Sequence, residues 1–162
     1  MNLSELGIKA RAASVLLAKM NVETKNKALI ACAEALVNES NSILEANAKD
    51  VLIGREKGMN EGLVDRLMLT EERIKGIAEG LEQVAALNDP VGEVLDMKKR
   101  PNGLLIGKKR VPLGVVGMIY EARPNVTPDA FALCFKSGNA VILRGGSDAI
   151  NSNIAIVKVL QD

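Results

Sequence analysis

The sequence of 162 residues contains no histidine and no tryptophan, and its few aromatic residues are Tyr120, Phe131 and Phe135. Without histidine the chain cannot form a Ser-His-Asp triad, a Cys-His pair, a histidine-ligated metal site or a histidine general base. With so few aromatic side chains it cannot build a stacking surface for single-stranded nucleic acid. The composition thus excludes several classes of self-contained active site.

Cysteine is also scarce, because Cys32 and Cys134 are the only thiols. Each stands among apolar helical residues and far in sequence from any base, which favours a buried, inert thiol over a nucleophile. Two distant thiols fit a reducing compartment better than a disulfide scaffold. The sequence has no secretory signal pattern, and no apolar run approaches the roughly 20 residues of a membrane span. We therefore expect a cytoplasmic protein without a membrane partner.

Charge is almost balanced, with 21 Lys and Arg against 20 Asp and Glu and a net charge of +1. Such a chain has no broad positive field for a polyanion. Two basic triplets, Lys98–Arg100 and Lys108–Arg110, leave a phosphate or nucleic-acid contact open. Lysines that protect an exposed β-ribbon from edge-to-edge pairing are the favoured explanation, so we expect no nucleic-acid partner.

Residues 1–89 have the apolar periodicity of helices, and the pattern changes at Pro90. The expected landmarks are a helix start near Leu3, an N-cap at Thr24, a third helix over Ser42–Arg55 that stops at Gly58, a short helix over Leu63–Leu67 and an N-cap at Thr70. Apolar residues at spacings of three and four predict a buried face on each helix. On the first helix these are Leu3, Leu6, Ala10, Ala13, Leu17 and Met20, and on the third they are Ile43, Leu44, Ala48, Val51 and Leu52.

Residues 90–111 predict an antiparallel β-hairpin. Val91–Lys99 and Leu104–Val111 flank the tetrapeptide Arg100-Pro101-Asn102-Gly103, whose proline, asparagine and glycine favour a tight turn. With a two-residue loop at the Pro-Asn pair, Glu93 would lie opposite Arg110 and form a favourable cross-strand pair.

Residues 112–162 alternate between strand and helix. The nearly unbroken apolar runs Val115–Tyr120 and Ala140–Leu143 predict strands buried on both faces. Thr127 predicts the N-cap of a buried helix that ends at Gly138-Asn139, and Asp148–Leu160 predicts another helix, capped by Ser147 or Asp148. Because crossover connections are right-handed and short, the two strands should be adjacent and parallel. The expected fold class is α/β, with helices and a hairpin ahead of a parallel sheet.

Two loops follow the expected strands, where ligands of open parallel sheets bind. The first runs from Tyr120 to Thr127 and contains Arg123 and Asn125. An asparagine amide can donate to a developing oxyanion, although it can equally well satisfy backbone groups of the turn. The second loop is Arg144-Gly145-Gly146-Ser147-Asp148, where two glycines permit close backbone approach beside an arginine. An anionic ligand and a plain turn with a helix cap are both open here.

Longer motifs point to one family. Val115–Thr127 (VVGMIYEARPNVT) and Lys136–Ser147 (KSGNAVILRGGS) closely resemble gamma-glutamyl phosphate reductase, or glutamate-5-semialdehyde dehydrogenase, of the aldehyde dehydrogenase superfamily. Four upstream phrases agree with it: Ala46–Asp50, Leu63–Leu67, Asp89–Gly92 and Arg100–Leu104. The resemblance implies an aldehyde dehydrogenase-like fold. Residues 1–89 would be its helical amino-terminal region, 90–111 a hairpin of the oligomerisation region and 112–162 the first βαβα part of a Rossmann-like, NADP-binding domain.

The resemblance implies the NADPH-dependent reduction of L-glutamyl 5-phosphate to L-glutamate 5-semialdehyde and phosphate, in proline biosynthesis. Asn125 matches the asparagine of the oxyanion hole in general aldehyde dehydrogenases, although Glu-Ala-Arg-Pro precedes it here instead of the shorter usual Pro-Trp. Arg144 matches the superfamily's cofactor-binding lysine, and Ser147 stands where NAD-preferring members often have glutamate. An arginine without an opposing carboxylate suits the 2′-phosphate of NADPH.

The remaining expected site residues follow from the same motifs. Tyr120, Glu121, Ala122 and Gly145 join Arg144 and Ser147 in the cofactor site, and no metal is expected. Arg123 is assigned to the substrate, where its guanidinium would bind the glutamyl carboxylate or the leaving phosphate.

Family members are well over twice as long as this chain, and neither Cys32 nor Cys134 matches their catalytic cysteine. The resemblance places that cysteine, which forms a thioester with the substrate, after Asp162. We therefore expect an amino-terminal portion that is inactive alone, from a homo-oligomeric enzyme with glutamate 5-kinase as a candidate partner. Two alternatives stay open: another aldehyde or acyl-phosphate dehydrogenase of the same fold, and a binding or assembly fragment without turnover.

Overall fold

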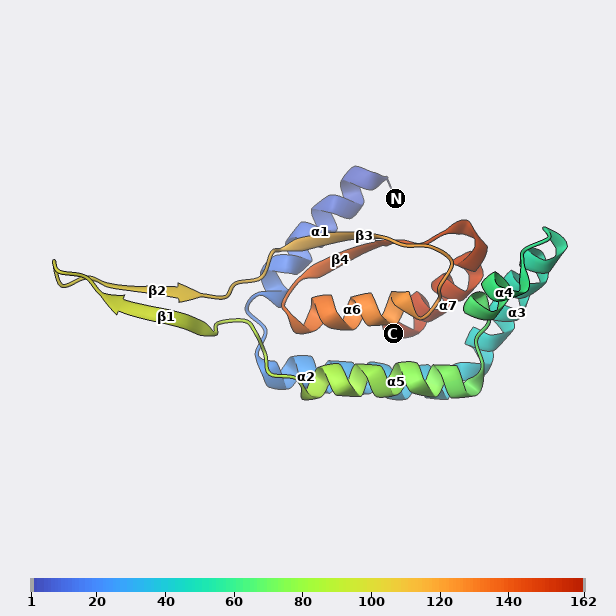
Figure 1. The fold of residues 1–162 in the computed structure, drawn as a ribbon, viewed down its shortest axis with the longest axis horizontal. Coiled ribbons are helices and arrows are strands. Elements are labelled where there is room, and N and C mark those ends of the chain that lie inside the picture. The colour runs from blue at the N-terminus through green and yellow to red at the C-terminus, as the bar shows by residue number, and fades with distance from the viewer. Residues whose placement is uncertain (1, 162) are drawn as a thin grey trace.

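The computed structural model describes residues 2–161, which form an α/β fold of helices, a projecting hairpin and a two-stranded parallel sheet (Figure 1). In chain order the elements are α1 (Leu3–Leu17), α2 (Val22–Asn38), α3 (Ser40–Glu56), α4 (Glu61–Leu67), α5 (Glu71–Ala86), β1 (Val94–Lys99), β2 (Leu105–Lys109), β3 (Val115–Ile119), α6 (Val126–Lys136), β4 (Ala140–Arg144), a 3₁₀ turn η1 (Ser147–Ala149) and α7 (Ile150–Gln161).

Two hydrophobic clusters hold these elements together. Helices α2 and α5 lie side by side and pack against α6 and α7, burying a core that includes Leu29, Leu36, Ile74, Leu81, Ala132 and Ile156 (Figure 1). A smaller cluster joins α3, α4 and η1 through Val51, Val64, Leu67 and Ala149, and Ala122 packs against it. The loop after β3 is therefore anchored to the helical part of the chain.

Two of the three expected threonine caps are wrong. Thr70 does cap α5, because its side chain accepts a hydrogen bond from the backbone nitrogen of Arg73. At α2 the cap is Asn21, whose side chain accepts from the backbone nitrogen of Thr24 at 2.8 Å, so the helix begins earlier than expected. Thr127 lies inside α6 and is fully buried, with its hydroxyl engaged elsewhere.

Helix α7 is capped by a residue that is remote in sequence. Asp50 of α3 accepts hydrogen bonds from the backbone nitrogens of Asn151, at 3.2 Å, and Ser152, at 2.7 Å. It also accepts from the side chains of both residues. The expected local cap by Ser147 or Asp148 is therefore wrong, because a buried carboxylate from α3 satisfies these amides instead.

The inward face of α3 is partly polar. Asn47 is 2% exposed, and its amide nitrogen donates to the backbone oxygen of Leu67 at 2.8 Å, while its oxygen accepts from the backbone nitrogen of Leu69 at 2.7 Å. Ala48 and Leu52, expected in the core, are exposed. Ile43 and Val51 are buried and Leu44 packs against the core, as expected. The prediction is wrong only for Ala48 and Leu52, because the hydrogen-bonded Asn47 and Asp50 occupy part of the inward face.

Two buried lysines, Lys25 and Lys136, connect α2, α6 and the end of α5. Lys25 is 0% exposed, and its ammonium group lies 2.7 Å from a carboxylate oxygen of Asp89. Lys136 is 3% exposed and donates to the backbone oxygen of Ala85 at 2.7 Å and to the side chain of Asn26. Burial lowers the pKa of Lys136 from its ordinary value, and the nearby Asp89 opposes that shift. These bonds tie α2, α5 and α6 together at the point where the hairpin leaves.

The hairpin forms as expected, but its loop differs. Strands β1 and β2 pair antiparallel and project from the body (Figure 1). The backbone nitrogen of Arg100 donates to Leu104 at 2.7 Å, and that of Gly103 donates to Arg100 at 2.9 Å. Gly103 adopts a φ of +87°, so Pro101, Asn102 and Gly103 form a longer loop than the expected two-residue one.

The expected pairing of Glu93 with Arg110 is nevertheless present, at 2.9 Å between the carboxylate and Nε. The longer loop shifts the strand register by one residue, and an irregularity between Val94 and Asp96 shifts it back. A bulge thus restores the pair that the shorter loop would have given directly.

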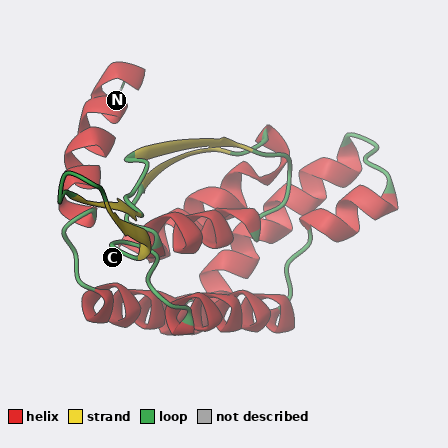
Figure 2. Ribbon diagram, turned by 60° about the vertical axis from the view of Figure 1, so that its left-hand side comes forward, coloured by secondary structure: helices red, strands yellow, loops and turns green. Residues whose placement is uncertain are grey.

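Strands β3 and β4 pair in parallel from Val115↔Ala140 to Ile119↔Arg144, as expected. Figure 2 shows this sheet above the helical layer, with α1 at one end. The prediction that β3 is buried on both faces is wrong, since Ile119 is 87% exposed. The reason is that α1 and α6 pack mainly against β4.

Helix α1 also buries less than expected, since Leu3 is 80% exposed and Ala13 is exposed. Its buried residues are Ala10 and Ser14.

Across the described residues, no helix combines the length and the apolar character that crossing a membrane requires.

Candidate functional site

The two loops at the carboxyl end of the parallel strands lie against each other. The backbone nitrogen of Tyr120 donates to the backbone oxygen of Arg144 at 3.1 Å. A Cβ at Gly145 would lie 2.5 Å from the side-chain nitrogen of Asn153 and 3.1 Å from the ring of Tyr120. A Cβ at Gly146 would lie 3.4 Å from the backbone nitrogen of Ala122. Any side chain at Gly145 would therefore force the side chain of Asn153 in α7 to shift.

A chain of hydrogen bonds fixes the first loop from below. The hydroxyls of Tyr120 and Thr127 are 2.6 Å apart, and Thr127 donates to the side-chain oxygen of Asn153 at 2.8 Å. Asn153 is 8% exposed, and its amide nitrogen has no hydrogen-bond partner among residues 2–161. The chain connects the end of β3 with α6 and α7, so it holds the intervening loop in one conformation.

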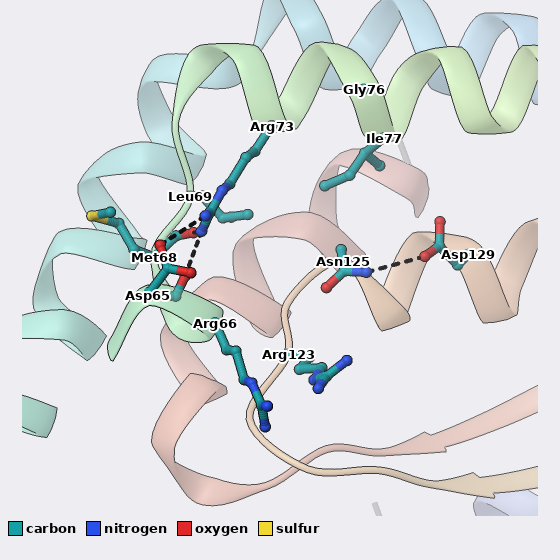
Figure 3. Close-up of a pocket in the computed structure, with 10 residues that line it drawn as sticks. All are labelled: Asp65, Arg66, Met68, Leu69, Arg73, Gly76, Ile77, Arg123, Asn125 and Asp129. Atoms are coloured by element: carbon teal, nitrogen blue, oxygen red, sulfur yellow. Dashed lines mark hydrogen bonds and ion pairs between the residues drawn. The ribbon is translucent and has the colours of Figure 1, made fainter. Parts of the chain in front are cut away.

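Above this loop lies a pocket of about 500 Å³, open to solvent. Figure 3 shows the residues that line it: Asp65, Arg66, Met68, Leu69, Arg73, Gly76, Ile77, Arg123, Asn125 and Asp129. They come from α4, the segment between α4 and α5, α5 itself, the loop after β3 and the first turn of α6. The structure thus brings together Arg123 and Asn125, which the sequence selected for the substrate and the oxyanion.

Asn125 is exposed and precedes α6 without capping it through its side chain. Its amide nitrogen lies 3.3 Å from a carboxylate oxygen of Asp129, a long hydrogen bond (Figure 3). Burial raises the pKa of Asp129 from its ordinary value, and the hydrogen bond from Asn125 opposes that shift. The amide is therefore held on a fixed backbone by a weak contact and can donate to a ligand in the pocket.

Three arginines line the pocket, and they differ in their contacts. Arg73 donates to the backbone oxygen of Met68 at 2.7 Å, to the backbone oxygen of Asp65 and to its carboxylate at 2.8 Å. Arg123 has a weak ion pair with Glu121, with 3.4 Å between Nε and the carboxylate, and this buried Nε has no hydrogen-bond partner in the described part of the chain. Arg66 and Arg123 extend into the same space, whereas Arg73 turns toward Asp65 (Figure 3).

The residues expected to bind a cofactor do not line one common pocket. Arg144 and Ser147 are exposed at the end of β4. Tyr120 and Gly145 line a hollow of about 400 Å³ beside α7, while Glu121 and Ala122 line a smaller one of about 160 Å³ with Arg66 and Arg123. Tyr120 and Ala122 also have structural contacts, with Thr127 and with the smaller hydrophobic cluster respectively.

Neither thiol lies in the pocket. Cys134 is 8% exposed within α6, Cys32 is half-buried, and burial raises the pKa of both thiols. A raised pKa lowers the fraction of reactive thiolate, in keeping with structural cysteines. Between residues 2 and 161, no group of three or more acidic or cysteine side chains is arranged to hold a metal ion.

The sequence analysis did not select Arg66, Arg73 and Asp65 as site residues. Asp65 and Arg66 lie on α4 and Arg73 lies in the first turn of α5, far in sequence from the strand-end loops. No local motif signals that these helices border the loop after β3. The apolar pattern predicted the helix over Leu63–Leu67, and the family resemblance included this phrase, but neither assigned it to a site.

Comparison with known proteins identifies the relatives of this fold. No family model matches the chain. The gamma-glutamyl phosphate reductase of Caldanaerobacter subterraneus subsp. tengcongensis is 61% identical over 154 residues, and that of Lachnospira eligens is 59% identical over 159 residues. These matches cover 95% and 98% of this chain. The chain is similar to the amino-terminal portion of gamma-glutamyl phosphate reductases.

Solved structures of gamma-glutamyl phosphate reductases give the same result. The enzyme of Thermotoga maritima superposes with a TM-score of 0.96 at 48% identity, and that of Saccharomyces cerevisiae with 0.93 at 33% identity. Each match covers 99% of this chain, and 39% and 41% of the respective structures. The chain spans only 37% and 38% of the length of the two curated reductases. The expected resemblance and the α/β fold class are confirmed.

Proposed function

We propose that the protein carrying this chain reduces L-glutamyl 5-phosphate to L-glutamate 5-semialdehyde and phosphate, in proline biosynthesis. The observation that carries the proposal is the 61% identity over 95% of the chain to a gamma-glutamyl phosphate reductase. The pocket supports it, because an amide donor and guanidinium groups meet there, as a reaction of an anionic acyl phosphate requires.

Asn125 is the proposed oxyanion donor. As the acyl carbon changes from planar to tetrahedral, its oxygen gains negative charge, and a neutral amide already in place stabilises that charge. The hydrogen bonds of Tyr120, Thr127 and Asn153 fix the backbone on which the amide stands. The long contact with Asp129 leaves the amide available to the substrate. Arg123 would bind the leaving phosphate or the glutamyl carboxylate.

NADPH is the proposed cofactor, and it supplies hydride for the reduction. Arg144 and Ser147 fit its 2′-phosphate, because Arg144 ends β4, Ser147 begins the 3₁₀ turn that follows, and both are exposed. The backbone from Tyr120 to Ala122 and Gly145 would lie along the cofactor, since these residues line the two hollows beside the strand ends. The side chain of Glu121 remains engaged with Arg123.

The nucleophile is proposed to be a cysteine outside these 162 residues, because Cys32 and Cys134 are buried or half-buried away from the pocket. Residues 1–89, 90–111 and 112–162 would be the helical region, the oligomerisation hairpin and the first part of the cofactor domain. A cytoplasmic homo-oligomer that works beside glutamate 5-kinase fits this assignment, since an acyl phosphate must be made and used before water hydrolyses it.

The forward reaction tests the proposal. The full-length gene product should oxidise NADPH when L-glutamyl 5-phosphate is supplied, and the 162-residue chain alone should not. Turnover by the isolated chain would show that the nucleophile is not missing. A full-length product without any turnover would favour the alternative of a binding or assembly protein.

A further inference from the structure

The pocket holds more positive charge than the substrate contact of Arg123 alone requires. Of its three arginines, Arg73 has its guanidinium bonded to the backbone oxygens of Asp65 and Met68 and to the Asp65 carboxylate. Its role is to hold the turn between α4 and α5. A guanidinium with these three partners has little capacity left for a ligand.

Arg66 has none of these engagements. It stands in the last turn of α4 and is exposed, and it makes no ion pair or side-chain hydrogen bond with any residue from 2 to 161. It lines both the 500 Å³ pocket and the adjoining 160 Å³ hollow, and Arg123 does the same. Figure 3 shows both side chains on the side of the pocket that faces the loop after β3.

Two positive side chains repel each other unless an anion lies between them. The carboxylates near this pair have other contacts: Asp65 is held by Arg73, Asp129 is contacted by Asn125, and Glu121 lies 3.4 Å from Arg123. Asp148 lines the 160 Å³ hollow as well, but its ion pair is with Lys57, at 3.8 Å, so no carboxylate of the described residues pairs with Arg66. The buried Nε of Arg123 is a donor without a hydrogen-bond partner among the described residues. A carboxylate or a phosphate between the two guanidinium groups would accept hydrogen bonds from both.

We propose that Arg66 of α4 is a substrate-binding residue that, with Arg123, clamps an oxyanion group of the substrate next to Asn125. This inference rests on the proposed function and adds to it a residue from the helical region. The shared ligand chemistry is a phosphate or a carboxylate, since L-glutamyl 5-phosphate carries both. Helix α4 would thus supply specificity to a site otherwise built from strand-end loops.

The reverse reaction separates the two groups, because phosphate and the carboxylate-bearing semialdehyde are then different substrates. The experiment measures the KM of each with NADP⁺ in the full-length gene product and in its Arg66→Gln and Arg66→Lys variants. Arg55→Gln, on an exposed basic residue of α3 outside the pocket, is the matched control.

Arg66→Gln should raise one KM about 10- to 100-fold, as expected for the loss of a charge-assisted hydrogen bond. A rise for phosphate alone identifies the phosphate as the ligand, and a rise for the semialdehyde alone identifies the carboxylate. Arg66→Lys should lie between, because lysine keeps the charge but not the bidentate geometry. Arg55→Gln should leave both KM values unchanged.

Two results would overturn the inference. One is an Arg66→Gln enzyme with both KM values unchanged. The other is a variant that loses kcat and melting temperature while its KM values stay the same, which would assign Arg66 to structure. If the wild-type enzyme forms no acyl phosphate from the semialdehyde, phosphate and NADP⁺, the result contradicts the proposed function itself rather than the role of Arg66.

Discussion

Single side chains in the loop after β3 divide into those that fix its backbone and those that face the pocket. Tyr120 bonds to the fully buried Thr127, and Ala122 packs into the smaller hydrophobic cluster. Between and beside these anchors, Arg123 and Asn125 line the pocket with few internal contacts. This is the arrangement expected of a preorganised site, in which neighbours hold the backbone and leave donors for the ligand.

Replacing Asn125 by alanine should lower kcat of the full-length enzyme about 100- to 1,000-fold, because an oxyanion donor acts mainly in the transition state. The KM for glutamyl phosphate should change little. Steady-state kinetics at saturating NADPH measures both constants. An equal rise in KM with kcat intact would instead assign Asn125 to ground-state binding.

Replacing Arg144 by alanine should weaken NADPH binding about 10- to 100-fold, since a charge-assisted contact with the 2′-phosphate is lost. NADH binding should be almost unaffected, because NADH lacks that phosphate. Titration of the full-length protein with each dinucleotide measures the two constants. Equal losses for both would exclude the assignment to the 2′-phosphate.

The half-buried carboxyl of Asp129 predicts a pH-dependent stability. Its raised pKa means that the folded state keeps the proton to a higher pH than the unfolded state, which releases it near pH 4. Stability is therefore lost as pH rises through the folded-state pKa. Asp129→Asn should be more stable than wild type at pH 7, and the difference should shrink at pH 3.

Denaturant unfolding at the two pH values measures that difference, with Glu45→Gln on the exposed face of α3 as a control for removing a surface charge. A stability difference that grows on acidification would mean that the Asp129 carboxylate is favoured in the folded protein.

At the scale of the elements, the connection between α3 and α7 is made by polar groups. Asp50 accepts four hydrogen bonds from Asn151 and Ser152, at distances from 2.6 to 3.2 Å. Asn47 adds a bond to Ser152 at 3.0 Å, one to Leu67 at the end of α4 and one to Leu69 just after it. This network positions α4 and α7 on either side of the strand-end loops.

Asp50→Ala should destabilise the protein by about 2–3 kcal/mol, because α7 loses its cap and buried donors lose their acceptor. Glu45→Ala, on the exposed face of the same helix, should stay within about 0.5 kcal/mol of wild type. The free energy of unfolding from denaturant titration compares them. A loss no larger than that of the control would show that water replaces the carboxylate without penalty.

The helices, the hairpin and the parallel strand pair could all be predicted from the sequence, because apolar periodicity and the turn residues are local signals. The cap of α7 could not be, since Asp50 and Ser152 are 102 residues apart. The buried Lys25 and Lys136 were missed for the same reason. Each is an ordinary surface residue by type, and its partners lie 51 to 111 residues away along the chain.

Over the whole molecule, the sequence predicted a ligand site at the two strand-end loops. The structure adds residues of α4 and α5 that line the pocket above the first loop. Arg123 and Asn125 follow β3 and could be selected from the rule that ligands bind at the carboxyl ends of parallel strands. Arg66 could not, because only the packing of α4 against Ala122 brings this helix over the loop. The proposed substrate pocket therefore joins the helical region to the sheet.

The central claim is that this chain helps to build the substrate pocket of an enzyme that exchanges an acyl group with phosphate. Its most direct test is the phosphate dependence of the reverse reaction in the full-length gene product, followed as NADPH formation from L-glutamate 5-semialdehyde and NADP⁺. The account predicts that NADPH forms only when inorganic phosphate is added, with an acyl phosphate as the product. NADPH formation at the same rate without phosphate, with release of a free carboxylic acid, would contradict it.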